Sequence, residues 1–219
     1  MNGATLVQPI VLLVDKAEPA AHTDAVHAAA LASVLAYAQE IETSGAAPVW
    51  DEWLAGPFTK TVRRADAKTF AKLAEKFDGV DHAAVSYGQA RALAFQPVTY
   101  DGMSRALAKL QVSGTELPER ASDSAPAPED VPAVVLNAGL GMSTGKCAAQ
   151  AGHALFAWYL TLGEAGRLEW YEDGCPFQVR FLDADDFAEI AATVSEDRLI
   201  VDAGRTEIAP DTATAFVLG

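Results

Sequence analysis

The sequence predicts an α/β protein made of two tandem β-α-β-α-β-β domains that pair as a pseudo-two-fold dimer within one chain. Three observations lead to this prediction. Short β-branched runs alternate with alanine-rich helical segments. The same order of elements occurs twice, which at this scale indicates duplication. A stretch rich in Pro, Ser, Ala and acidic residues separates the two copies, so we expect domains at 1–113 and 133–219 and a linker at 114–132.

Each copy begins with a buried strand and an alanine-rich helix. The runs PIVLLVD and PAVVLNA, from Pro9 and Pro132, are β-branched and apolar, as expected of buried strands. Each leads through a loop into a helical segment, which begins near Asp24 in the first copy and near Lys146 in the second. Because related subunits most often pair with two-fold symmetry, we expect the two copies to pack face to face.

The next elements also correspond. TVRRADAKTFAKLAEKF and QVRFLDADDFAEIAATV each predict a strand, an aspartate N-cap (Asp66 or Asp183) and an amphipathic helix with a phenylalanine inward (Phe70 or Phe187). AAVSYGQARALAFQPVTY and LIVDAGRTEIAPDTATAF then each predict two short strands around a glycine turn. This completes the β-α-β-α-β-β order in both copies.

Composition restricts the possible functions. The net charge is -14, from 30 acidic and 16 basic residues, and such a balance repels polyanions. Cys147 and Cys175 lack CxxC spacing and are expected to be reduced thiols. His22 and His27 have no third ligand in view, so we expect no metal site. No apolar run reaches about 18 residues and no leader is apparent, so we expect a cytoplasmic protein outside the membrane.

The segment GLGMSTGKCAAQAGHA brings a glycine loop to the start of a helix, where free N–H groups favour an anion. A phosphate-binding P-loop does not fit, because three residues rather than four separate Gly141 from Gly145 and Cys147 replaces the magnesium-binding Ser or Thr. A purely structural alternative makes the glycines a turn, with Ser143 or Thr144 capping the helix. In this alternative the Lys146 side chain is solvated, and we expect an exposed lysine in the first helical turn to contribute little to helix stability.

Two separate motifs carry a resemblance to a known family. LGMSTGKCAAQAGHA (140–154) and DAGRTEIAPDTATAFVLG (202–219) closely resemble the type 2, archaeal and eukaryotic-type, peptidyl-tRNA hydrolases, and they occur in the family's order. The first copy resembles the same fold only in outline. The family usually has an arginine and an aspartate just before the Leu-x-Met segment, and these positions fall on Asn137 and Gly139 here.

The resemblance implies hydrolysis of the ester that joins a peptide to the 3′ end of tRNA, without a metal or organic cofactor. Such a reaction needs a positioned water and a donor or cation for the developing oxyanion. The resemblance implies catalytic roles for Lys146, Asp202 and Thr206, and substrate binding by Gly145, Gln150, His153 and Arg205. In the first copy, Asp24, Ser86 and Ala90 align with the three catalytic residues, so we expect that copy to be inactive.

Charge bears on the expected tRNA partner. Residues 131–219 carry 13 acidic and five basic residues, whereas nucleic-acid affinity depends heavily on phosphate neutralisation. The first copy contains a basic cluster that is either an ordinary solvated surface or a cationic surface lent to the second copy. Its members are Lys60, Arg63, Arg64, Lys68, Lys72 and Lys76, the last three at intervals of four.

Two hypotheses follow. The first is a peptidyl-tRNA hydrolase in which one active and one degenerate copy are fused. The alternative is a catalytically inactive binding or regulatory protein of the same fold, which uses the Lys146 loop for a small anionic ligand. The acidic balance and the replaced Arg-Asp pair favour the alternative, whereas Lys146, Asp202 and Thr206 favour the enzyme. A monomer is one option for the oligomeric state, because the pairing is within the chain.

Overall fold

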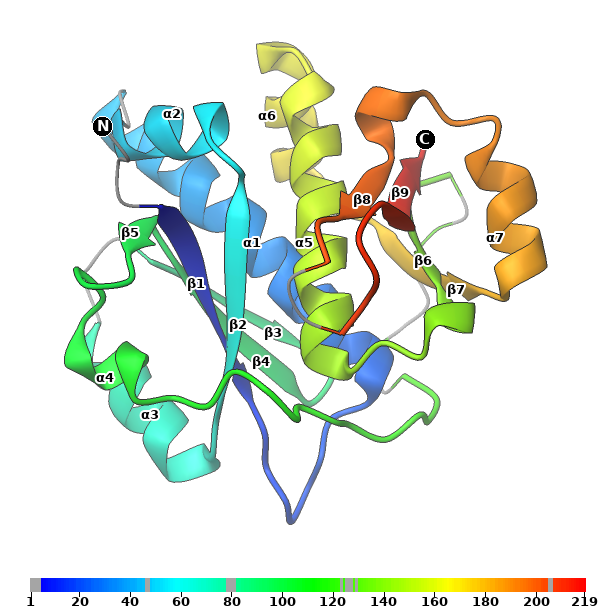
Figure 1. Cartoon of the computed structure of the whole chain (residues 1–219). Helices are drawn as coiled ribbons and strands as arrows, with labels where there is room; N and C mark the ends of the chain where they lie inside the picture. Colours follow the sequence, from blue (N-terminus) through cyan, green and yellow to red (C-terminus); the bar gives the residue numbers. More distant parts are fainter. Residues whose placement is uncertain are drawn as a thin grey trace.

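The computed structural model describes residues 5–45, 48–77, 82–122, 124, 128, 130–204 and 207–219. In this part of the chain the strands form two separate mixed sheets, with helices between them and on their outer faces (Figure 1). The predicted α/β class is confirmed.

The first half of the chain builds one sheet. Its strands run in the order β2-β1-β4-β3, with β1 parallel to β2 and antiparallel to β4, and β5 beside the start of β1. The elements are β1 (Leu6–Leu13), α1 (His22–Ser44), α2 (Pro48–Ala55), β2 (Thr59–Ala65), α3 (Ala67–Lys76), β3 (His82–Tyr87), β4 (Ala90–Phe95), β5 (Val98–Thr99) and α4 (Arg105–Ala108).

The second half builds the other sheet. Its order is β7-β6-β9-β8, with β6 parallel to β7 and antiparallel to β9, and β8 antiparallel to β9. The elements are β6 (Ala133–Asn137), η1 (Ala138–Leu140), α5 (Thr144–Thr161), α6 (Glu164–Glu172), β7 (Gln178–Leu182), α7 (Ala184–Ala191), η2 (Glu196–Arg198), β8 (Ile200–Asp202) and β9 (Thr212–Leu218).

Both halves contain a short helix that the predicted order lacks. Helices α2 and α6 follow the long helices α1 and α5, so each half contains the order β-α-α-β-α-β-β, and the first half adds β5 and α4 after it. Helix α2 begins at Pro48, a residue suited to the first helical position, and buries Trp50 and Trp53 one turn apart. The prediction missed both helices because they are too short to show a clear hydrophobic period.

The predicted helix starts at Asp66 and Asp183 are confirmed. The Asp66 carboxylate accepts a hydrogen bond from the Thr69 N–H at 2.7 Å, and Asp183 accepts from two N–H groups of the first turn of α7. Phe70 and Phe187 face inward from these helices, as predicted, and are buried. The capped helices α3 and α7 cover the outer faces of the first and second sheets.

The long helices α1 and α5 lie side by side between the two sheets (Figure 1). Their alanines let the backbones approach closely, and one hydrophobic cluster contains residues of both halves. Aromatic rings fill the space beside the helices. Tyr37 of α1 lies 5.3 Å from Phe156 and 6.3 Å from Tyr159, both of α5, between ring centroids. The two halves are therefore held together by a shared apolar core.

The segment predicted as a linker is anchored at its start. Thr115 and Leu117 are buried, and the Leu117 N–H donates to Thr144 Oγ1 at 2.9 Å. The Gly145 N–H donates to the Thr115 carbonyl at 3.3 Å, and the His22 N–H donates to the Pro118 carbonyl at 2.9 Å. Residues 115–118 thus join the starts of α1 and α5, which is more than a flexible spacer does. The domain boundaries at 113 and 133 stay predictions.

Among the described residues, no helix has both the length and the apolar character that crossing a membrane would require.

Candidate active site

The start of α5 is fixed by a capping residue that a second loop holds in place. Ser143 Oγ accepts a hydrogen bond from the Lys146 N–H at 3.2 Å, which confirms Ser143 as a cap. The Ser143 N–H and hydroxyl donate in turn to the carboxylate of Glu207, at 2.9 and 2.6 Å. A carboxylate is favoured at a helix N-terminus. Glu207 was missed by the sequence analysis, because only the fold brings the loop after β8 to α5.

Lys146 and Asp202 form an ion pair. Lys146 lies in the first turn of α5 and Asp202 is the last residue of β8, and Lys146 Nζ contacts Asp202 Oδ2. Their side chains are only 13% and 7% exposed. The expectation that the Lys146 side chain is exposed is therefore wrong. The fold sets β8 at the edge of the sheet beside α5, so the amine reaches a carboxylate rather than water.

Two further donors fix the Asp202 carboxylate. Gln150 Nε2 donates to Oδ2 at 2.6 Å, and the Gly204 N–H donates to Oδ1 at 2.8 Å. Gln150 follows Lys146 by one turn, so both point to the same side of α5. Gly204 has a φ of 71°, and a Cβ there would lie 2.7 Å from the Pro210 nitrogen, so this turn requires glycine.

The other predicted site residues are placed as follows. Gly145 is buried in the first turn of α5, where a Cβ would come within 3.4 Å of Thr115 Cβ. His153 follows Gln150 by three residues and lies on the same side of the helix. Arg205 and Thr206 lie outside the described residues.

Lys60 reaches this site from the first half of the chain. It comes from β2, and its Nζ lies 3.4 Å from His153 Nδ1. The amine also lies 3.7 Å from the ring centroid of Phe58, 4.5 Å from that of Trp53 and 5.0 Å from that of Phe156. The prediction placed Lys60 in a surface cluster, and this is wrong because Lys60 is buried.

Burial controls the protonation of this pair. Desolvation lowers the pKa of Lys60 well below its ordinary value. Burial also lowers the pKa of His153 well below its ordinary value, and the nearby charges of Lys60 and Lys146 lower it further. His153 is therefore neutral at neutral pH, with Nδ1 available to accept a hydrogen bond from the Lys60 amine.

The rest of the predicted basic cluster does not make one surface. Arg63 is buried and donates to three carbonyl groups around the end of α4, at 3.0 to 3.3 Å. Arg64 donates to the Gly114 carbonyl and to the Gln111 side chain. The three exposed lysines lie on α3, which covers the outer face of the first sheet: Lys68, Lys72 and Lys76.

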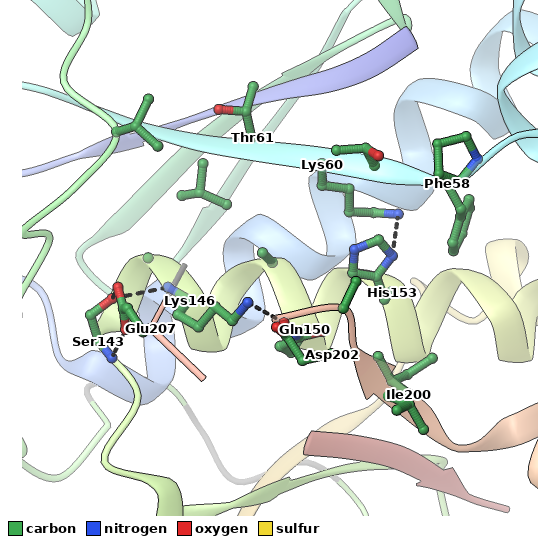
Figure 2. A pocket seen from close by; sticks show the side chains of 18 of the residues that line it. Phe58, Lys60, Thr61, Ser143, Lys146, Gln150, His153, Ile200, Asp202 and Glu207 are labelled. Carbon is green, nitrogen blue, oxygen red and sulfur yellow. Dashed lines mark hydrogen bonds and ion pairs between the residues drawn. The ribbon is translucent and has the colours of Figure 1, made fainter. Parts of the chain in front are cut away.

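The side chains of Lys60, Lys146, Gln150, His153 and Asp202 line a pocket of about 690 Å³ between the two halves. Strand β2 and the loop before it form one wall, and α5 with β8 forms the other. Figure 2 shows Lys146 of α5 beside Asp202 and Gln150. Further along α5, it shows His153 next to Lys60 of β2. The pocket thus combines a buried ion pair with a second amine further along α5. Apolar side chains, among them Phe58 and Val201, complete the lining.

A comparison with known families finds a similarity in the second half. Residues 131–219 match the family model described as Peptidyl-tRNA hydrolase PTH2. No curated protein and no solved structure matched the chain. The match contains Lys146, Gln150, His153 and Asp202, the residues that meet in the pocket. It begins at residue 131, so the resemblance of the first half to this family stays a prediction.

The departure at residues 137–139 has a packing reason. Asn137 Oδ1 accepts a hydrogen bond from the Gly139 N–H at 3.0 Å, which makes a tight turn after β6. A Cβ at Gly139 would lie 2.7 Å from Ala184 Cβ at the start of α7. The aspartate of the peptidyl-tRNA hydrolase pattern therefore cannot stand here unless α7 moves away.

The first-half residues that align with the predicted catalytic set have a different arrangement. Asp24 lies buried in the first turn of α1, and its carboxylate accepts a hydrogen bond from Ser122 Oγ. Ser86 is exposed on β3, and Ala90 is buried at the start of β4. This arrangement puts a buried carboxylate where the second half has an amine.

Among the described residues, no group of three or more His, Cys, Asp or Glu side chains is placed to hold a metal ion. Both cysteines are buried and unpaired with each other. Burial raises the pKa of Cys147 to about 12 and that of Cys175 to about 11, so both are neutral thiols at neutral pH.

Proposed function

We propose that this protein hydrolyses the ester bond of peptidyl-tRNA and releases tRNA and peptide. The observation that carries the proposal is the contact between Lys146 and Asp202 on one wall of a pocket large enough for a nucleotide ester. The peptidyl-tRNA hydrolase match over residues 131–219 supports the same reaction.

The roles follow from the contacts of Asp202. Gln150, Lys146 and the Gly204 N–H hold the carboxylate in one orientation, so its remaining lone pairs can orient a water molecule for attack on the ester carbonyl. The carbonyl oxygen becomes negative as the water adds. Lys146, whose amine contacts Asp202 Oδ2, stabilises that oxyanion. Asp202 accepts the proton that the attacking water loses. As the bond between the carbonyl carbon and the 3′ oxygen breaks, that oxygen takes up this proton and leaves as the tRNA hydroxyl.

The remaining predicted residues keep proposed roles beside this pair. Thr206 follows Gly204 by two residues in the sequence, and we propose that its hydroxyl belongs to the catalytic set. We propose that Arg205 and His153 contribute to substrate binding. Gly145 keeps the first turn of α5 close to residues 115–117, which holds the pocket wall in place.

We further propose that the two halves arose by duplication and form a pseudo-two-fold pair, of which only the second half is catalytic. The common strand order supports this, because β2-β1-β4-β3 and β7-β6-β9-β8 have the same parallel and antiparallel relations. The pairing of α1 with α5 is the contact that a two-fold axis would create. In this proposal the first half supplies a wall of the pocket instead of a second site.

The test is hydrolysis of N-blocked aminoacyl-tRNA by the purified full chain, measured as release of the blocked amino acid. We expect turnover above the uncatalysed rate, and a loss of about a hundredfold or more in Asp202→Asn. Lys72→Met, which removes an exposed lysine of α3, is the matched control and keeps wild-type activity. Wild-type protein that binds the substrate without cleaving it supports the inactive binding protein instead.

A further inference from the structure

Lys60 is an unusual residue for a protein interior. Its stem crosses α5 where Gly152 leaves room, since a Cβ at Gly152 would lie 3.4 Å from Lys60 Cδ and Cε. Within the described part of the chain, its amine has no carboxylate within ion-pair distance, and its polar neighbour is His153. Burying an amine without an anion opposes folding. An apolar side chain of similar length would fill this space without that cost.

A second unfavourable feature lies next to the first. Phe58 has a φ of 53°, in the left-handed region that bulky residues rarely adopt. This backbone sets its ring 3.7 Å from Lys60 Nζ and 5.1 Å from the His153 ring. Strained backbone of this kind is concentrated at functional sites. Two adjacent features that oppose folding, both lining the same pocket, indicate that this corner has a function.

The position of this corner relative to the ion pair limits what it binds. Lys146 and His153 are seven residues apart on α5, which corresponds to about 10 Å along the helix. The Lys60 amine lies beside His153, whereas the Lys146 side chain extends along the helix and meets Asp202 beside Gln150, between the two ends (Figure 2). In an aminoacylated terminal nucleotide, the ester is on one side of the ribose and the 5′-phosphate on the other.

We propose that Lys60 and His153 form an anion subsite that binds the 5′-phosphate of the terminal nucleotide while its ester lies at Lys146 and Asp202. The amine of Lys60 faces the phosphate oxygens and donates a hydrogen bond to His153 Nδ1, which fixes the position of the amine. The other ring nitrogen of His153 then carries the proton and donates to the same anion. This inference rests on the proposed hydrolysis for the identity of the ligand. It also gives the first half of the chain a direct part in substrate binding.

The first experiment measures binding and needs no turnover. Adenosine 5′-monophosphate and adenosine are titrated by calorimetry into the full-length wild type, Lys60→Met and the control Lys72→Met. We expect the monophosphate to bind about tenfold or more tightly than adenosine in the wild type and control, and equally in Lys60→Met. Equal binding of the two ligands by the wild type overturns the proposal, as does a phosphate preference that survives in Lys60→Met.

Two further measurements keep the result interpretable. If Lys60→Met does not fold, the wild type is treated with an amine-acylating reagent and the modified lysines are mapped by mass spectrometry. Protection of Lys60 by the monophosphate but not by adenosine supports the subsite, and equal protection contradicts it. The carboxylate of an N-blocked amino acid is the other anion considered. Protection by this carboxylate without protection by the monophosphate overturns the assignment to phosphate.

A kinetic arm separates this inference from the proposed function. N-blocked aminoacyl-adenosine is compared with its 5′-phosphate as a substrate, and Lys60→Met is expected to raise KM for the phosphate form about tenfold with little change in kcat. If the wild type binds the monophosphate through Lys60 but hydrolyses neither ester, the anion subsite is supported and the proposed hydrolase function is refuted. If the wild type hydrolyses both esters with the same KM, the hydrolase function is supported and the anion subsite is refuted.

Discussion

Replacing Lys146 by alanine tests the chemistry and the packing of the site together. The substitution removes the amine that contacts Asp202 Oδ2 and leaves a carboxylate that is only 7% exposed. The hydrolysis rate should fall by about a hundredfold or more, because an oxyanion-stabilising group is lost. Stability should fall as well, because a largely buried carboxylate loses its counter-charge.

The size of the stability loss follows from the contacts that remain. Breaking a fully buried pair typically costs about 3–5 kcal/mol. Asp202 keeps its hydrogen bonds from Gln150 and from the Gly204 N–H, and the Lys146 side chain is 13% exposed, so water can replace part of the lost interaction. We therefore expect a loss of about 2 kcal/mol, which for a chain of this size lowers Tm by about 4–8 °C.

The assay combines urea unfolding with hydrolysis of N-blocked aminoacyl-tRNA. Single variants Lys146→Met and Asp202→Asn are compared with the double variant, so that the coupling free energy of the pair is obtained from a double-mutant cycle. The double variant should recover part of the stability, because the unpaired charge is gone, while hydrolysis stays near background. Lys72→Met again serves as the control on an exposed surface.

Two results would refute this reasoning. A Lys146→Ala protein with wild-type stability would show that the ion pair does not exist in solution. A coupling free energy near zero between Lys146 and Asp202, together with normal hydrolysis in both single variants, would remove the pair from the mechanism. A destabilised but fully active Lys146→Ala protein would leave the pair as a structural contact only.

Two other predictions concern stability. Burial between two aromatic rings lowers the pKa of His27 to about 4, so below about pH 6.5 the unfolded chain takes up a proton that the folded protein resists. Stability should therefore fall from pH 6.5 to 4, by up to about 3 kcal/mol from this residue, and urea unfolding of His27→Phe should show a flatter pH profile. Gly139→Asp should destabilise by about 1–3 kcal/mol because its Cβ overlaps Ala184, whereas Gly163→Asp, at an open helix cap, should be neutral or stabilising in the same measurement.

Local patterns were enough to predict much of the fold. The α/β class, the repeated order of strands and long helices, and the capped starts of α3 and α7 all follow from side-chain periodicity and capping chemistry, which act over a few residues. The short helices α2 and α6 were missed because their stability comes from packing, such as the burial of Trp50 and Trp53, and not from a local signal.

For the candidate site too, the sequence predicted some features and the tertiary structure decided the others. The resemblance of the two motifs to peptidyl-tRNA hydrolases implied that Lys146, Gln150, His153 and Asp202 share a site, and helical spacing placed the first three on one face of a helix. Only the tertiary structure decided that Lys146 is buried in an ion pair, that Glu207 holds the helix cap and that Lys60 enters the pocket from the other half. These contacts join residues 56, 64 and 93 positions apart, and such pairings depend on how two sheets and two helices pack, which no local pattern encodes.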